Sequence, residues 1–188
     1  PLKTFNQWFD EALASEVMEP NAMNLSTVSK SNMPAGRIVL LKEVDKGFVF
    51  YTNYQSDKGR ELEDNPVAAL TFFWPELERQ VRIQGNVEKV SEEMSTEYFQ
   101  SRPKESQIGA WTSPQSTVIK SRDILLDREK SIKEKHESDA VLPRPKQWGG
   151  YRLNPVHMEF WQGRPSRLHD RIAYTLVDGE WKINRLAP

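Results

Sequence analysis

Apolar residues recur every three or four positions at the start of the chain. The residues in this series are Leu2, Phe5, Trp8, Phe9, Ala12 and Leu13. They fall on one side of a helix, while Gln7, Asp10 and Glu11 fall on the other. The segment therefore predicts an amphipathic helix that packs on a sheet.

Short apolar runs separated by turn residues predict strands over much of the remaining chain. The predicted strands are 38–41, 48–52, 67–74, 79–90, 151–153, 156–161, 167–177 and 180–186. Asp45-Lys46-Gly47 and Asp178-Gly179 predict hairpin turns. Within 79–90, alternation places Gln80, Arg82 and Gln84 on one polar face.

Other segments predict helices and loops. A short helix over 58–64 ends at Asn65-Pro66, a second runs from the N-cap Ser91 toward Phe99, and the charged segment 116–135 predicts a third, followed by a loop over 138–147. Strands outnumber helices and short turns join them. We therefore expect a mainly β (α+β) protein, an antiparallel barrel with peripheral helices, rather than a doubly wound parallel sheet. The length of 188 residues fits a single domain, 1–188.

Composition and charge exclude several classes of function. The net charge is −1, so no global basic field points to nucleic acid or to an anionic membrane. Cysteine is absent and the three histidines lack metal-ligand spacing, so we expect no disulfide and no metal site. The sequence shows no membrane-spanning apolar run and no signal peptide. We expect a soluble, cytosolic protein.

A row of cationic side chains precedes the last predicted hairpin. If 167–171 is extended, Arg167, His169 and Arg171 project from one face, and Leu168 and Asp170 project from the other. Such a row suits an anion or a polar ring. Taken alone, it more often marks a solvated strand face.

Other cations occupy positions where a phosphate could bind. The chain has neither a Gly-x-Gly-x-x-Gly turn nor a P-loop, so side chains must hold any nucleotide phosphate. Arg37 and Lys42 bracket a short apolar run and, five residues apart on a regular strand, should point to opposite faces. Tyr98, Arg102 and Ser106 lie at a helix end and in the loop beyond it, where they form a candidate phosphate clamp. Taken alone, Arg102 also fits a cation at a helix C terminus.

Several short blocks follow one another in an order known from one family. They are Arg37-Ile38-Val39-Leu40-Leu41-Lys42, Tyr51-Thr52-Asn53, Glu78-Arg79-Gln80-Val81, Tyr98-Phe99-Gln100-Ser101-Arg102-Pro103, Ser106-Gln107-Ile108-Gly109-Ala110-Trp111, Gln115-Ser116, Trp148-Gly149-Gly150-Tyr151, and the run 159–171 with the terminal Arg185-Leu186-Ala187-Pro188. Together they resemble the pyridoxamine (pyridoxine) 5'-phosphate oxidases, flavoenzymes of vitamin B6 metabolism. The resemblance extends from about the first helix to the last residue and implies an FMN-binding split barrel.

The resemblance also implies an activity and its site. The activity is oxidation of pyridoxine 5'-phosphate and pyridoxamine 5'-phosphate to pyridoxal 5'-phosphate, with O2 as electron acceptor and release of hydrogen peroxide, and of ammonia from the amine. The residues implied to bind FMN are Arg37, Ile38, Val39, Leu40, Leu41, Lys42, Tyr51, Thr52, Lys58, Gln80, Gln115, Ser116, Trp161 and Arg171. Those implied to bind substrate are Lys42, Tyr98, Arg102, Ser106, Arg167, Leu168 and His169, with Arg167 and His169 as candidate catalytic residues.

The chain departs from the family pattern at one position. Family members carry Ser-Arg-Lys where this chain has Ser56-Asp57-Lys58. An acid beside a phosphate is repulsive by about 1 kcal/mol or more, so Asp57 must point away or weaken FMN binding. Arg60, three residues along the predicted helix, is a candidate for the missing charge. Family members also carry an N-terminal segment before the point where this chain begins.

The resemblance further implies an obligate homodimer with FMN between the subunits. The early-strand residues would come from one chain, and Gln80, Gln115, Trp161 and Arg171 from the other. Two alternatives stay open: a split-barrel flavoprotein oxidase of another substrate, such as a phenazine precursor, and a binding protein that holds pyridoxal phosphate or FMN without turnover.

Overall fold

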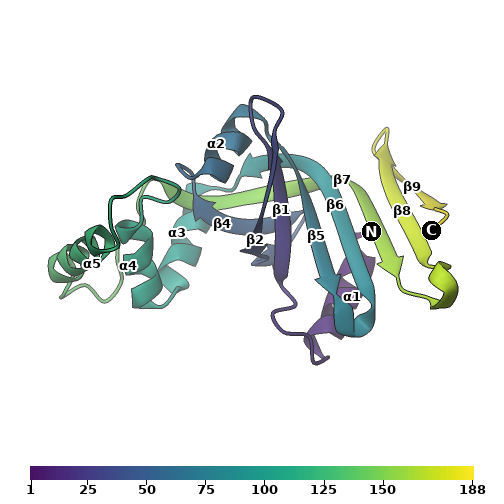
Figure 1. Cartoon of the computed structure of the whole chain (residues 1–188), viewed down its shortest axis with the longest axis horizontal. Coiled ribbons are helices and arrows are strands. Elements are labelled where there is room, and N and C mark those ends of the chain that lie inside the picture. The colour runs from purple at the N-terminus through teal and green to yellow at the C-terminus, as the bar shows by residue number, and fades with distance from the viewer.

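The core of the structure is one curled antiparallel sheet (Figure 1). The structure, a computed structural model, describes residues 1–188. The strands are β1 (Ala22–Val28), β2 (Pro34–Leu40), β3 (Glu43–Val44), β4 (Phe48–Asn53), β5 (Val67–Trp74), β6 (Arg79–Lys89), β7 (Trp148–Gln162), β8 (Asp170–Val177) and β9 (Glu180–Arg185). Their order is β2-β1-β5-β6-β7-β4-β3, with β8 paired to β7 and β9 to β8. The predicted antiparallel, mainly β architecture is confirmed.

Helices lie around this sheet. They are α1 (Leu2–Leu13), α2 (Asp57–Asp64), α3 (Glu92–Ser101), α4 (Lys104–Thr112) and α5 (Asp123–Lys135), with 3-10 turns η1 (Pro75–Leu77) and η2 (Pro165–Arg167). Figure 1 shows α4 and α5 at one end of the molecule and β8 and β9 at the other. None of the helices is both long enough and apolar enough to cross a bilayer.

The first helix packs on the sheet as its apolar spacing predicts. Phe5 is fully buried, and its ring centroid lies 4.8 Å from that of Phe48 and 5.0 Å from that of Phe72. Leu25 and Leu70, on the neighbouring strands β1 and β5, belong to the same buried cluster. The amphipathic pattern thus fixes α1 against the main core.

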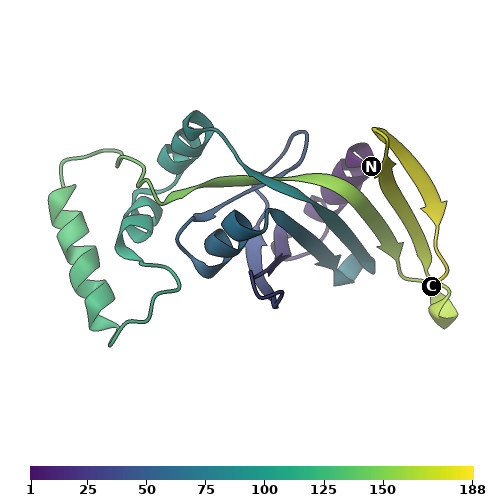
Figure 2. The same ribbon diagram turned by 90° about the horizontal axis from the view of Figure 1, so that it is seen from above.

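One long strand crosses the molecule from the side of the helices α3 and α4 to the side of β8 (Figure 2). β7 has 15 residues and joins the two strands predicted over 151–153 and 156–161. Pro155 does not end the strand because the pairing register with β6 shifts between Gln84 and Gly85, opposite the proline. An irregularity of this kind accommodates a residue that has no N–H to donate.

Four segments differ from the sequence-based expectations. β1 has no apolar run that predicts it, because only alternate residues, Met23, Leu25 and Thr27, are buried. Of the predicted helix 116–135, only α5 forms. A separate helix, α4, begins directly after Pro103. The strand predicted from 167 begins instead at Asp170.

Candidate active site

A polar cavity of about 680 Å³ lies between the sheet and the helices α2, α3 and α4. Its lining residues are Arg37, Ile38, Val39, Leu40, Lys42, Tyr51, Thr52, Lys58, Tyr98, Arg102, Pro103, Ser106, Gln115 and Trp148. A smaller hollow of about 340 Å³ adjoins it and shares Tyr51, Thr52, Arg102, Ser106, Gln115 and Trp148. The structure therefore brings most of the residues that the resemblance implies to bind FMN together around one cavity.

One wall of the cavity carries a buried lysine beside an amide. The Nζ of Lys58 lies 3.5 Å from Oε1 of Gln115, and the hydroxyl of Thr52 donates to the same oxygen at 3.4 Å. Burial, followed by repulsion from Arg37, lowers the pKa of Lys58. A lysine in this state gains stability from an anion, because an anion favours its charged form.

Arg37 is held from behind by a carboxylate. Its Nη2 donates to Oε2 of Glu61 at 3.0 Å, and its Nη1 donates to the hydroxyl of Thr27. The prediction that Arg37 and Lys42 point to opposite faces is wrong, because β2 ends at Leu40 and both cations line the cavity.

Leu41, the residue that follows β2, does not line the cavity. Leu41 is 4% exposed and belongs to the main core rather than to the cavity wall. The structure thus does not bring the Leu41 side chain to the site, although the resemblance implies it as a cofactor residue.

Asp57 does not line the cavity. It begins α2, and its carboxylate pairs with Arg60 at 2.5 Å. Arg60 also donates to the carbonyl of Gln55. The suggestion that Arg60 supplies a charge to the cavity is therefore wrong, because its guanidinium is bound to Asp57 on the outer side of the helix.

Stacked aromatic rings form the opposite wall. The ring of Tyr51 lies 4.0 Å from that of Tyr98 and 5.4 Å from that of Trp148. The guanidinium of Arg102 lies 4.8 Å from the Trp148 ring, and its Nη2 donates to the carbonyl of Ser106 at 3.0 Å. Its Nη1 is buried without a partner, and burial lowers the pKa of Arg102. Ser106 lies in α4 and not in a loop.

A second cluster of predicted residues lies on the other half of the molecule. Gln80, Trp161 and Arg171 are side by side in the registers of β6, β7 and β8. The His169 ring lies 4.6 Å from the Trp161 ring, and its Nδ1 accepts from the backbone N–H of Arg164 at 3.1 Å. This cluster therefore joins an amide, an indole, an imidazole and a guanidinium.

The predicted alternation of Arg167, His169 and Arg171 is wrong. Arg167 belongs to the turn η2, where it and Ser166 adopt positive φ angles of 60° and 58°. Extended geometry begins only at Asp170, so the three side chains do not form a strand row. Arg167 and Leu168 are exposed beside the second cluster.

Two residues that adjoin in the sequence lie in different surroundings. Gln115 contacts Thr52 and Lys58, so within one chain it belongs with the early strands and not with Gln80 and Trp161 as expected. Ser116 has a positive φ of 64°, is exposed, and does not line the cavity.

The two clusters are far apart within one chain. Trp148 lines the cavity and Trp161 lies in the second cluster, at opposite ends of β7. Thirteen residue steps separate them, about 43 Å along an extended strand. Figure 2 shows β7 as a continuous ribbon between the two ends. A small ligand cannot contact both clusters of the same chain.

Sequence comparison accounts for both halves of this arrangement. Residues 9–136 match the family described as pyridoxamine 5'-phosphate oxidase, and residues 148–188 match the pyridoxine 5'-phosphate oxidase C-terminal dimerisation region. The chain belongs to the pyridoxamine 5'-phosphate oxidase family. The second cluster lies within the dimerisation region, apart from Gln80.

Relatives in this family are similar over the whole chain. The pyridoxine/pyridoxamine 5'-phosphate oxidase of Polynucleobacter asymbioticus is 57% identical, with 100% of this chain and 89% of the relative covered. That of Gloeothece citriformis is 54% identical, with 100% and 88% covered. The family resemblance inferred from the sequence blocks is confirmed.

Solved structures place the fold in the same group. PhzG from Burkholderia lata, in complex with tetrahydrophenazine-1-carboxylic acid, is 29% identical with a TM-score of 0.95 and covers 100% of this chain and 92% of its own. A pyridoxamine 5'-phosphate oxidase-related, FMN-binding protein from Nostoc punctiforme is 17% identical with a TM-score of 0.77, covering 98% and 97%. The latter likeness concerns the fold alone.

Sequence patterns miss two residues that hold the site from behind. Glu61 orients Arg37, and the buried Glu159 on β7 binds Arg171. Glu61 is one of four acids in α2, a helix that has the composition of a solvated surface, and Glu159 is a single acid within β7. No local signal distinguishes these carboxylates from exposed ones.

Proposed function

We propose that this protein is an FMN-dependent oxidase that converts pyridoxine 5'-phosphate and pyridoxamine 5'-phosphate to pyridoxal 5'-phosphate. The alcohol and O2 give the aldehyde and hydrogen peroxide. The amine, O2 and water give the aldehyde, ammonia and hydrogen peroxide. Full-length relatives named for this activity, 53–57% identical, support the proposal.

The observation that carries the proposal is the buried, unpartnered Nη1 of Arg102. An unsatisfied guanidinium nitrogen is costly to bury, so its position fits an anionic ligand. Lys42, Tyr98 and Ser106 line the same cavity and supply an ammonium and two hydroxyls. We assign these four residues to the phosphate of the substrate.

The remaining cavity residues fit FMN. Lys58 and Arg37 provide cations for its phosphate, while Thr52 and Gln115 provide neutral groups that donate and accept hydrogen bonds. Gln80, Trp161 and Arg171 of the second cluster supply an amide, an indole and a guanidinium. When bound, the flavin supplies the two-electron chemistry and passes the electrons to O2.

We assign the proton chemistry to His169 and the covering of the substrate ring to Arg167. Because Nδ1 of His169 accepts from the Arg164 backbone N–H, the neutral ring carries its proton on Nε2. Contact with Trp161 fixes the plane of the imidazole. The exposed guanidinium of Arg167 is available to a ligand that reaches this cluster.

We further propose that the working form is a homodimer in which each site combines the cavity of one subunit with the second cluster of its partner. The separation of the two clusters along β7 supports this, as does the match to a dimerisation region. An apolar hollow beside Val67 and Val156 on the outer sheet face supplies surface for such a contact.

Mixing two variants with weakened FMN sites, at an FMN concentration too low to load either variant alone, tests the shared site. Lys58→Met damages the cavity and Arg171→Ala damages the second cluster, so a mixed dimer holds one doubly damaged site and one intact site. Random reassortment of equal amounts should restore about a quarter of wild-type activity, because half the dimers are mixed. Failure of the mixture to regain activity, with mixed dimers present by mass spectrometry, would contradict the shared site.

One assay tests the activity itself. The FMN-loaded protein is incubated in air with pyridoxine 5'-phosphate, and pyridoxal 5'-phosphate and hydrogen peroxide are measured together. Equal molar yields of the two products are expected. Binding without turnover would favour the storage protein, and turnover of tetrahydrophenazine-1-carboxylic acid in preference to the phosphate ester would favour the phenazine alternative.

A further inference from the structure

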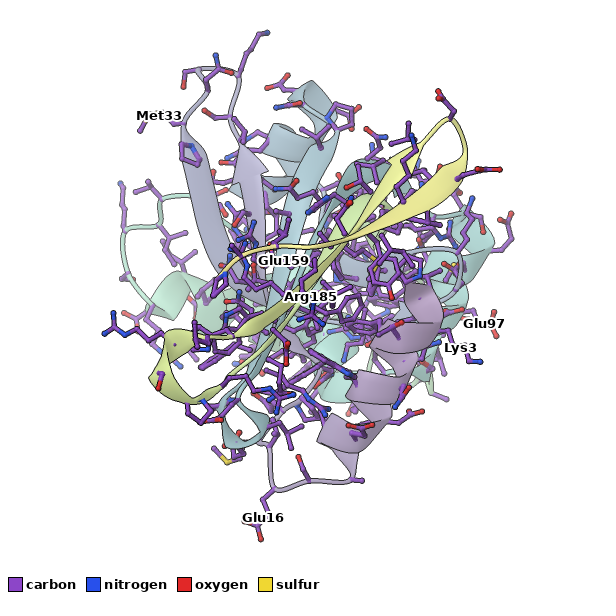
Figure 3. The ribbon with its side chains drawn as sticks, turned by 90° about the vertical axis from the view of Figure 1, so that its right-hand side faces the viewer. Lys3, Glu16, Met33, Glu97, Glu159 and Arg185 are labelled. Atoms are coloured by element: carbon purple, nitrogen blue, oxygen red, sulfur yellow. The ribbon has the colours of Figure 1, made fainter.

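Glu159 is a buried carboxylate between two arginines. It lies on β7 and is 3% exposed. Its Oε1 accepts from Nε of Arg171 on β8 at 2.8 Å, and its Oε2 lies 3.7 Å from Nη1 of Arg82 on β6. Figure 3, which looks onto β8 and β9, labels Glu159 behind these strands. A carboxylate in this position needs such partners, because an unpaired buried charge is strongly unfavourable.

The backbone near residue 187 holds the same arginine from a second side. Nη1 of Arg171 donates to the carbonyl of Ala187 at 2.9 Å, and the N–H of Leu186 donates to the carbonyl of Arg171 at 2.9 Å. An adjacent pair, Arg185 with Asp170 at 2.6 Å, ties the same segment to β8. Both strands of the hairpin therefore contribute to the position of Arg171.

These contacts leave a defined part of the guanidinium free. Arginine has five N–H donors in a rigid planar fork. Nε is bound to Glu159 and one hydrogen of Nη1 to Ala187, so the other hydrogen of Nη1 and both hydrogens of Nη2 remain for a ligand. The fork is oriented before any ligand arrives, which removes the cost of ordering a long flexible side chain on binding.

We propose that Glu159 is a positioning residue for the flavin site, which acts by fixing Arg171 together with the Ala187 carbonyl. The inference rests on the proposed function, in which Arg171 faces the flavin. Arg82 is 45% exposed and farther away, so it offsets the charge of Glu159 without orienting it. Arg171, by contrast, makes a direct hydrogen bond that fixes both partners.

A double-mutant cycle on FMN affinity tests the proposal. The dissociation constant is measured by quenching of flavin fluorescence in wild type, Glu159→Gln, Arg171→Ala and the double variant. Glu159→Gln should weaken binding about tenfold, the scale found for residues that orient a binding group from behind. In the Arg171→Ala background, the same change should have less than about a twofold effect, because coupled residues are not additive.

A matched control separates positioning from general stabilisation. Asp45 pairs with Arg152, whose side chain is 13% exposed, in a part of the sheet outside both clusters. Asp45→Asn should lower the melting temperature yet leave the FMN dissociation constant unchanged. Equal loss of affinity in Asp45→Asn and Glu159→Gln would overturn the proposal, as would a Glu159→Gln effect that persists without Arg171.

A second variant keeps the proposal testable if Glu159→Gln does not fold. A chain that ends at Arg185 lacks the Ala187 carbonyl but retains the Glu159 pair. It should bind FMN about threefold more weakly, a change on the scale of the net contribution of one hydrogen bond. Unchanged affinity would show that the Ala187 carbonyl does not help to position Arg171. If wild type itself binds no FMN, the proposed function fails. If wild type binds FMN and the variants bind it equally well, only the positioning role of Glu159 fails.

Discussion

The Nζ of Lys58 and the Oε1 of Gln115 lie 3.5 Å apart although 57 positions separate them in the sequence. The first residue lies on α2 and the second follows α4, so this contact joins two elements at one wall of the cavity. The amide faces the ammonium with its oxygen, which leaves the remaining donors of the lysine for an anion.

Lys58→Met should lower FMN affinity about tenfold or more, the scale for losing a hydrogen bond to a charged group. Fluorescence titration of the apoprotein measures the effect. Lys46→Met is the matched control, because Lys46 is an exposed lysine paired with Glu88. Similar losses in the two variants would indicate a general electrostatic effect rather than a contact made by Lys58.

FMN binding should weaken at alkaline pH. The weakening should begin at a lower pH than it would if Lys58 had the pKa of an ordinary lysine. Burial and Arg37 lower the pKa of Lys58, so its charge is lost early as pH rises, and the anion loses its partner. A bound phosphate favours the charged form, so binding should take up protons in this range. In Lys58→Arg the charge persists, and the alkaline loss of affinity should disappear. A wild type whose FMN affinity is constant through this range would contradict the assignment.

Arg102→Gln should raise KM for pyridoxine 5'-phosphate by about 10- to 100-fold, because a charge-assisted hydrogen bond to the phosphate is lost. The FMN dissociation constant should stay the same. Steady-state kinetics with FMN in excess measures the first quantity and fluorescence titration measures the second. If FMN affinity fell while KM did not change, the phosphate assignments of Arg102 and Lys58 would have to be exchanged.

Asp57→Arg should tighten FMN binding, because it replaces an acid with a cation on α2, one position before Lys58, which lines the cavity. Asp57→Asn removes the negative charge without adding a positive one and should have a smaller effect in the same direction. Both are read from the FMN dissociation constant. An unchanged or weaker affinity in Asp57→Arg would show that position 57 does not reach the phosphate.

His169→Ala should lower turnover with FMN still bound, since general acid–base groups contribute about 100-fold or more to rate. His169→Asn and His169→Gln place an amide near the Nδ1 and Nε2 positions respectively. Neither exchanges protons, so neither should restore kcat, whereas His169→Asn should restore the contact with the Arg164 N–H. Intact turnover in His169→Ala would withdraw the proton role.

Sequence patterns predict the elements that depend on local chemistry. The period of α1, the Ser91 cap of α3 and the Asp178-Gly179 turn are all confirmed. Ser91 accepts from the N–H of Met94, as an N-cap should. Each of these features is decided by residues within a few positions of one another, and so is visible in one short window.

The parts that failed depend on distant partners. The turn η2 begins at Pro165, and Asp170, which follows it at the start of β8, binds both Arg164 and Arg185. β1 is polar at alternate positions and becomes a strand because β2 and β5 flank it. Alternation alone cannot show where a strand begins when its partners come from distant parts of the chain.

An unbroken 15-residue strand also determines how the protein should respond to dilution. In the proposed shared site, the flavin contacts come from opposite ends of β7 in two different subunits, so the number of complete sites should depend on the second power of chain concentration when dimers dissociate. The isolated chain retains its own core around Phe5, so flavin release should precede unfolding. We therefore expect dilution to lower the activity of this protein reversibly, and added FMN to reduce that loss.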